Sequence, residues 1–347
     1  MGMALDGGKR AMKPLDYPYR AKSNIIVQDM EFCDIDQQAA CLSGYDQKYQ
    51  QMSCGKYEGW FRTALLGGDV GLFFETFNQS LDQWGSSPSD RYGFVFFMTQ
   101  SNQGHLGDRE FCGDQLLVLP PGHSFDFRAQ PHTSYCVVSI DKPAFDAVLQ
   151  SSIQSDRQLN AIQQSTLIFN SPDTLMLLRQ LVTYVIKLLQ SQNRAGVSMS
   201  TVNGAKRSLI ELLAGFIADH APNSAWPATL ETESSVFLTG QIRDFIRDKG
   251  GVDISPILLA QEFQISRRRL ELMFRRQFNQ SPADYIQTVK LNEFRSALMR
   301  PENLENSIGD IAAQSGFWHL SRLAQIYRQH FGELPSELRM SLRKAPT

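Results

Sequence analysis

Short runs of apolar residues dominate the chain between positions 57 and 140. Four of these runs are rich in aromatic and β-branched residues and are separated by Gly, Pro, Ser and Asp. They cover residues 71–81, 92–98, 114–122 and 132–140. Because short strands with turn residues at regular spacing are typical of all-β folds, this region is predicted to form a sandwich or a small barrel.

The apolar pattern then changes from alternation to steps of three or four residues, which predicts helices. These helices cover residues 142–154, 171–192 and 203–221. The stripe of the second helix consists of Leu175, Leu178, Val182, Val185 and Leu189. So broad an apolar face must be buried. Two partners remain open for it, because the helices either cover the β region or pair with a second copy of the chain in a homodimer.

A second, purely helical region follows a break in the pattern. The break, PNSAWPATLETESS over 222–235, holds two Pro and has no hydrophobic period. With residues 1–24 as a disordered tail, the sequence predicts a first domain over 25–221, which includes the helices that could pair with a second copy, and a helical domain over 236–347. The expected fold class is therefore α+β with two domains, joined by a linker over 222–235.

The helical region contains the same device twice: a helix, a short turn and a second helix. The two units cover about 255–278 and 307–331. Ser266 and Ser307 stand where helices begin, and Gly316 stands in a turn that needs a left-handed backbone. This is the pattern of a helix-turn-helix, here present in tandem.

The two units also match residue by residue. Leu270 corresponds to Leu323 and Phe278 to Phe331, so the offset is 53 residues, and each unit closes with F-x-x-x-P. The helix between them, about 282 to 299, would be about 27 Å long at about 1.5 Å per residue. Two reading helices held apart by such a rod could enter successive major grooves, about 34 Å apart, on one face of DNA.

At this point the residues resemble a known family. The segments LAQEFQISRRRLELMFRRQFNQSP and IAAQSGFWHLSRLAQIYRQHFGELP resemble the DNA-binding domain of AraC/XylS-type transcription regulators. The resemblance implies a cytoplasmic bacterial activator with an N-terminal effector-binding domain, whose partners are double-stranded DNA and RNA polymerase. Upstream, GLFFETFNQSLDQWG is similar to the subgroup that contains the ethanolamine-utilisation activator and ornithine regulators.

In the first unit, the second helix has an apolar side and a charged side. The apolar side consists of Leu270, Met273, Phe274 and Phe278. Arg267, Arg268 and Glu271 lie near the helix start, where Arg can read guanine and Glu can read cytosine. Arg275 and Arg276 are better placed for phosphates. A solvated charged face is the alternative interpretation.

In the second unit, the apolar side consists of Leu323, Ile326, Tyr327 and Phe331. The candidate DNA contacts are Ser321, Arg322, Gln325 and Arg328. The resemblance implies base readers at positions 268, 271 and 272 of the first unit and near 320, 321, 322, 324 and 325 of the second. Leu272 departs from the polar residue common there, and Gln325, where Arg is common, could read adenine.

Three other features of this region carry expectations. Backbone N–H groups at Ser281 and Ser307 could receive phosphates, because they open helices. Trp318, directly after the turn, is expected in the core. His319 and His330 have no Cys or acidic partner at ligand spacing, so no metal site is expected.

Composition and charge agree with the division into a first domain over 25–221 and a helical domain over 236–347. The chain is 42% hydrophobic and has no apolar run of about 18 residues, so cores but no membrane span are expected. Its five cysteines form no C-x-x-C, which favours a reducing cytoplasm over disulfides or zinc. Residues 236–347 hold 16 Lys+Arg and 12 Asp+Glu, whereas the remainder holds 18 and 24. The net charges of +4 and −6 favour a polyanionic partner for the helical domain alone.

The β region suggests a sensor pocket. Phe94, Phe96 and Met98 alternate along one strand, and Phe73 and Glu75 along another. If both faces line a barrel interior, Glu75 is a carboxylate in an aromatic box, which suits an ammonium ligand. The subgroup resemblance implies ethanolamine. The alternative is simple core packing with Glu75 on the solvent face.

Two further function classes are an enzyme and a regulator without an effector. The turn LVLPPG followed by HSFDFRAQ resembles a cupin-like barrel, and many cupins are metal enzymes. Their site needs H-x-H, whereas His105, His123 and His132 are widely spaced, and hydrolase and nucleotide-binding motifs are absent. No enzyme and no cofactor beyond an effector are therefore expected. A regulator without an effector, controlled by a protein partner or by expression level, stays open.

Overall fold

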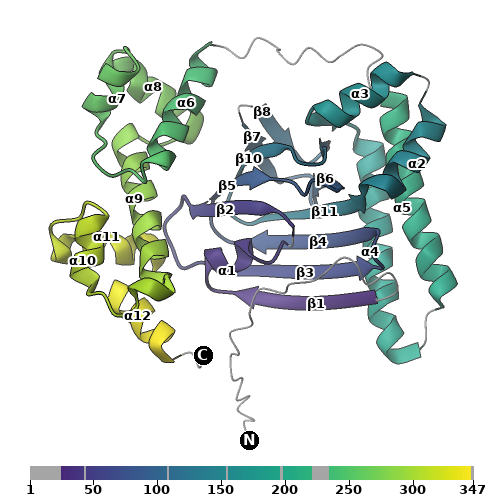
Figure 1. The fold of residues 1–347 in the computed structure, drawn as a ribbon, viewed down its shortest axis with the longest axis horizontal. Helices are drawn as coiled ribbons and strands as arrows, with labels where there is room; N and C mark the ends of the chain where they lie inside the picture. Colours follow the sequence, from purple (N-terminus) through teal and green to yellow (C-terminus); the bar gives the residue numbers. More distant parts are fainter. Residues whose placement is uncertain are drawn as a thin grey trace, which may run out of the picture.

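A computed structural model describes residues 25–42, 44–107, 109–153, 155–195, 198–220 and 234–344. The expected tail and residues 222–233 of the expected linker lie outside these ranges. The N-terminal domain is rich in β-strands and the C-terminal domain is helical, as the change of hydrophobic period predicted (Figure 1).

The strands of the N-terminal domain form two antiparallel sheets. The larger has the order β1-β3-β4-β11-β6-β9-β12 and the smaller β2-β5-β10-β7-β8. The strands of the larger sheet are β1 (Ile25–Phe32), β3 (Gly59–Leu66), β4 (Val70–Phe77), β11 (Thr133–Asp141), β6 (Arg91–Phe97), β9 (Gln115–Leu119) and β12 (Leu167–Asn170). Those of the smaller sheet are β2 (Asp46–Gln51), β5 (Leu81–Ser86), β10 (Ser124–Ala129), β7 (Gln103–Leu106) and β8 (Arg109–Cys112).

The expected cupin-like barrel is not confirmed. Within the described residues no ladder joins the two sheets, so each keeps its edges and they pack face to face. Phe73, Leu117 and Val137 from the larger sheet meet Leu81 and Phe127 from the smaller one in the core between them. The domain is therefore a two-sheet sandwich rather than a closed barrel.

Helices cover the outer face of the larger sheet. The helices of this domain are α1 (Ile35–Ala39), α2 (Lys142–Ser152), α3 (Asp156–Gln164), α4 (Pro172–Ala195) and α5 (Met199–His220). The apolar stripe of α4, including Leu178 and Val182, shares one core with Leu213 of α5 and with Phe94 and Val138 of the sheet. The sequence left two partners open for these helices, the β region and a second copy of the chain. The helices pack against the β region.

The C-terminal domain is a chain of short helices arranged along one long one (Figure 1). They are α6 (Ser234–Asp248), α7 (Pro256–Glu262), α8 (Arg267–Phe278), α9 (Pro282–Met299), the 3₁₀ turn η1 (Pro301–Asn303), α10 (Ile308–Gln314), α11 (Leu320–Phe331) and α12 (Pro335–Lys344). The long helix α9 has the predicted bounds, and α6 begins inside the expected linker. No helix among the described residues is long and apolar enough to cross a membrane.

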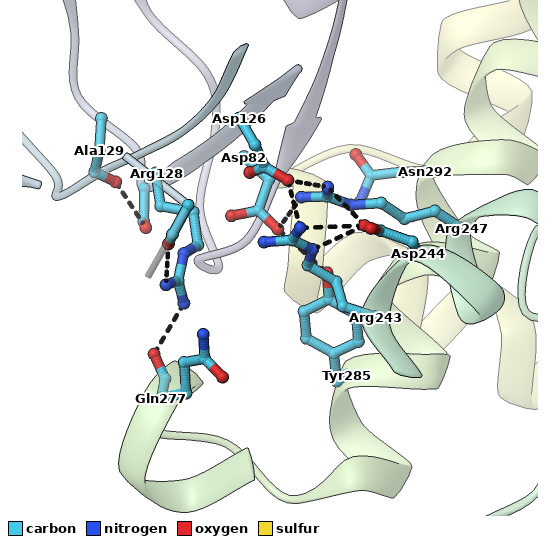
Figure 2. A network of polar contacts seen from close by, with 12 residues as sticks. Asp82, Asp126, Arg128, Ala129, Arg243, Asp244, Arg247, Gln277, Tyr285 and Asn292 are labelled. Atoms are coloured by element: carbon cyan, nitrogen blue, oxygen red, sulfur yellow. Dashed lines mark hydrogen bonds and ion pairs between the residues drawn. The ribbon is translucent and has the colours of Figure 1, made fainter. Parts of the chain in front are cut away.

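The two domains contact each other through the outer face of the smaller sheet (Figure 2). Arg247 of α6 forms an ion pair with Asp82 of β5, with an N–O distance of 2.8 Å, and Arg243 forms one with Asp126 of β10. Tyr285 of α9 donates a hydrogen bond to Asp82. The face is polar because Asp82 and Asp126 alternate with residues that point into the sandwich.

Candidate nucleic-acid interface

The first helix-turn-helix, α7 and α8, has its own hydrophobic core. Leu270, Met273 and Phe274 are buried in it, as the spacing predicted. Phe278 is partly buried and its ring centre lies 4.8 Å from that of Tyr285 in α9. The apolar side of α8 therefore faces α9, and its charged side is left outside.

The second unit, α10 and α11, is built in the same way on a separate core. Leu323, Tyr327 and Phe331 are buried, and Ile326 packs against them. Phe294 of α9 lies in this core, with its ring centre 5.7 Å from that of Tyr327. Each half of α9 thus supports one unit.

The turns and helix starts follow the sequence prediction. The side chains of Ser266 and Ser307 accept hydrogen bonds from backbone N–H groups three residues on. Gly316 has a φ of 75°. In the first unit Gln264 takes the same left-handed place with a φ of 52°. A non-glycine residue there is sterically less favourable, so the first turn is the more strained of the two.

The predicted DNA contacts lie on the outward sides of α8 and α11. The exposed ones are Arg267, Arg268, Arg275, Arg276, Ser321, Arg322, Gln325 and Arg328. Glu271 is half-buried, and its carboxylate lies 4.0 Å from Arg275 Nε. Both helices therefore present polar or cationic side chains to solvent, and the structure leaves them accessible to a polyanion.

Comparison with known proteins identifies the family to which this helical domain belongs. A family model described as a helix-turn-helix domain matches residues 259–341. The XylDLEGF operon transcriptional activator 2 of Pseudomonas putida is 35% identical over 138 residues, which cover 37% of this chain and 87% of that protein. The chain belongs to the AraC/XylS family of DNA-binding transcription regulators.

The other similar proteins have either a shorter match or a lower identity. The XylDLEGF operon transcriptional activator of Pseudomonas putida is 36% identical over 104 residues, or 30% of this chain, and the match spans 32% of that relative's length. Among solved structures, the AraC-like transcriptional activator CuxR has a TM-score of 0.36 at 15% identity, covering 68% of this chain and 80% of CuxR. ToxT from Vibrio cholerae has a TM-score of 0.29 at 14% identity, covering 87% and 99%.

Trp318 is not in the core of this AraC/XylS regulator, contrary to the prediction. Its side chain is 78% exposed, and its neighbour Leu320 is 52% exposed. The reason is local, since Phe317 takes the inner place, with its ring centre 5.9 Å from that of Phe294. Trp318 and Arg322 border a groove of about 340 Å³ between the two units. Its exposure beside the start of α11 makes Trp318 a candidate contact that the sequence prediction missed.

The helix starts at Ser281 and Ser307 are less suited to phosphates than predicted. The hydroxyl of Ser281 donates to the carboxylate of Asp284 and accepts from its N–H. Ser307 and Asp310 form the same pair. Because a carboxylate already lies at each helix start, a phosphate would meet a negative charge there.

His330 is a buried residue of the domain contact. Its Nε2 lies 3.0 Å from the carbonyl oxygen of Gln51 and donates to it. Burial lowers the pKa of His330, and the hydrogen bond to Gln51 opposes this. His319, by contrast, is exposed. Over the described parts of the chain, no group of three or more His, Cys, Asp and Glu is arranged to hold a metal ion.

The predicted effector residues do not meet in one pocket. Phe73 and Glu75 face the core between the sheets, whereas Phe94 and Phe96 face α2, α4 and α5, where Met98 packs at the edge. The reason is strand order, because β11 lies between β4 and β6. Glu75 pairs with Tyr135, and Tyr135 pairs with Phe97, so it is Phe97 that shares the face of Glu75.

Glu75 is buried in a polar cluster. This corrects both interpretations of Glu75, the open ammonium site and the solvent-facing residue. Its side chain is 1% exposed and accepts hydrogen bonds from Gln38, Tyr49 and Tyr135. Burial raises the pKa of Glu75 to about 7, although the bonds from Tyr135, Gln38 and Tyr49 lower it. With these donors already on the carboxylate, the site is not an open counter-ion for an ammonium group, and it is not on the solvent face.

Proposed function

We propose that this chain is a transcription activator that reads two adjacent DNA segments, one with α8 and one with α11. The observation that carries the proposal is the repeated geometry: two separate cores on one long helix, each leaving a polar or cationic helix face exposed. Relatives named as transcriptional activators support activation over repression. On this proposal RNA polymerase is a partner.

The outward side chains divide into two roles. Near the start of α8, Arg268 and Glu271 read base edges, and near the start of α11, Arg322 and Gln325 do so. Arg267 and Ser321 lie beside them. Arg275, Arg276 and Arg328, further along the helices, contact phosphates. Trp318 adds an apolar surface that can contact thymine methyl groups.

Selection from random duplex DNA with the full chain tests this function. We expect enrichment of a sequence with two conserved segments. Arg268→Ala should relax one segment and Arg322→Ala the other, while Asn160→Leu, an exposed change on α3, should leave both unchanged. A chain that enriches no sequence over the starting pool is not a sequence-specific regulator.

We also propose that the N-terminal domain binds a small-molecule effector between its sheets. A cavity of about 30 Å³ lies there, bordered by Gln83, Phe127 and Tyr135. Gln83 is 3% exposed, and its Nε2 has no hydrogen-bond partner among the described atoms. Since a space of this size holds only a few atoms, a ligand must part the side chains as it enters. A mainly apolar molecule with a hydrogen-bond acceptor fits this lining better than an amine.

A ligand screen separates this proposal from an effector-independent regulator. A compound that binds the folded chain raises the thermal midpoint. We expect such a rise with a small apolar acceptor and its loss in Gln83→Leu, with Gln28→Leu on β1 as the control outside the cavity. If amines, amino acids, apolar acids and cofactors all leave the midpoint unchanged, control by a protein partner or by expression level is the better account.

Homodimer formation is a further proposal for α4. Its outer side leaves Met176, Leu177 and Tyr184 about half exposed. Three apolar side chains on one helix suit contact with a second copy of the chain. Sedimentation of the full chain tests this, and Tyr184→Lys should shift a dimer to monomer.

A further inference from the structure

A loop of the N-terminal domain lies between the two helix-turn-helix units. This loop is counted as residues 51–56; it begins at the last residue of β2, leads toward β3 and reaches α9 (Figure 1). On one side it enters the first unit, where Met52 is 9% exposed and belongs to the same core as Leu270 and Phe274. The carbonyl of Met52 accepts a hydrogen bond of 3.1 Å from Gln280, directly after α8.

On its other side the loop holds the end of α11. The carbonyl of His330, near the last turn, is one of those left without a partner inside the helix. Gly55 N–H donates to it at 2.8 Å and Gln51 Nε2 donates to it at 3.0 Å. The return bond from His330 to the Gln51 carbonyl closes the contact. The loop therefore acts as a cap on the second recognition helix.

The side chain of Asn292 fixes the position of the 51–56 loop along α9. Asn292 is 4% exposed, and both ends of its amide are used by Gln51. Its Oδ1 accepts from Gln51 N–H and its Nδ2 donates to the Gln51 carbonyl, each at 2.9 Å. Two hydrogen bonds between the same pair of residues fix both the position of the loop along the α9 axis and its orientation.

The end of α8 is held by the same domain. Arg128 of β10 donates a hydrogen bond of 2.8 Å to the carbonyl of Gln277 (Figure 2). Its guanidinium also lies 4.7 Å from the ring centre of Phe278. Gln277 stands in the last turn of α8, as His330 does in α11. The N-terminal domain thus forms hydrogen bonds with the carboxyl ends of both α8 and α11. These contacts do not cover the candidate DNA-binding residues near the amino ends of the two helices, where Arg268 and Arg322 are exposed.

We propose that the 51–56 loop, with Arg128, sets the distance and angle between α8 and α11 and thereby the DNA spacing that the chain accepts. The inference rests on the proposed reading of DNA by both helices. The two units have separate cores on the two halves of α9, so a bridge that contacts both units adds to α9 in setting their relative angle. Met52, Gln51 and Arg128 are that bridge, and they are positioning residues that touch no DNA.

The experiment measures affinity for duplexes in which the two selected segments are moved apart or together by single base pairs. A duplex with one segment only serves as the reference. The full chain carries Asn292→Leu, which removes both bonds to the loop, or Arg128→Met, which keeps the apolar stem. Asn160→Leu, on the exposed side of α3, is the matched control.

The wild-type chain and the control should prefer one spacing, and each variant should lose about tenfold of that preference while its one-segment affinity stays the same. An unchanged spacing preference in both variants overturns the inference and leaves the proposed function standing. An equal loss of affinity for all duplexes also overturns it, since damage to the units and not to their spacing would be the cause. If the wild-type chain binds no duplex, the proposed function fails first.

Discussion

At the scale of single residues, the position of an arginine along α8 decides what it can contact. Arg268 stands in the first turn and Arg276 in the last, and both are exposed. Recognition helices of this kind enter the major groove with their amino-terminal residues. On the proposed function, the first turn of α8 therefore contacts bases and the last turn contacts phosphates.

Replacing each arginine should separate these roles. Arg268→Ala should cost about 1–3 kcal/mol and relax the choice of base at one position. Arg276→Ala should weaken binding to all sequences alike and lower the slope of log affinity against log salt by about 1. Titrations at several salt concentrations with matched and single-mismatch duplexes measure both. If the two variants behave alike, the orientation of α8 is not the one described here.

Trp318 and Phe317 are neighbours with opposite surroundings. Trp318→Ala removes an exposed ring and should leave the thermal midpoint unchanged while it weakens DNA binding. Phe317→Ala removes a ring packed on Phe294 and should lower the midpoint. Thermal unfolding and DNA titration of both variants check this. Unchanged affinity in Trp318→Ala would leave the exposed indole without a role on DNA.

Glu75 should make the stability of the N-terminal domain depend on pH. Its pKa is about 7 in the folded chain against an ordinary value of 4.5. The folded state thus holds the proton more tightly, so the free energy of unfolding is highest below the unfolded pKa and falls as pH rises through the folded pKa, by roughly 3 kcal/mol in total. Burial raises the pKa of Tyr49, Tyr57 and Tyr135, which face Glu75, so they stay neutral.

The comparison with Glu75→Gln isolates this effect, because every other titrating group is shared. Urea unfolding between about pH 5 and about pH 8 should show a smaller fall in stability for the variant than for wild type. Identical pH profiles would mean that the folded carboxyl titrates near its ordinary value.

At the scale of elements, the sequence predicted the helices of the C-terminal domain well and the arrangement of strands poorly. Ser266, Ser281 and Ser307 with the prolines and Gly316 mark helix ends through local hydrogen bonds, and such signals are readable in one chain. The face of Glu75 depends on β11, which is distant in sequence and lies between β4 and β6. Strand order is a long-range property, so the joint pocket predicted from alternation was wrong.

Two leucines on α8 test the inward and outward sides of that helix. Leu270 is fully buried, whereas Leu272 is 61% exposed. Leu270→Ala should lower the free energy of unfolding of the C-terminal domain by about 2–5 kcal/mol, and Leu272→Ala by less than about 0.5 kcal/mol. Chemical denaturation measures both. Equal losses would show that α8 is rotated from the position described.

At the scale of the whole molecule, the contact between the domains could not be predicted from the sequence. Asp82, Arg247 and Asn292 look like ordinary surface residues in their own segments. They are buried because the other domain covers them: Arg247 pairs with Asp82, and Asn292 pairs with the backbone of Gln51. No local sequence pattern predicts these contacts. His330, in the last turn of α11, also contacts the other domain, through Gln51 and Gly55. On the proposed function and the inference drawn from these contacts, the N-terminal domain takes part in DNA reading in addition to binding an effector.

On the proposed function, one chain reads two adjacent DNA segments with α8 and α11. A hydroxyl-radical footprint of the full chain on its selected DNA tests this most directly. We expect two protected patches on one face of the duplex, about one helical turn or 10 base pairs apart. A single protected patch, or protection without any repeat, would contradict it.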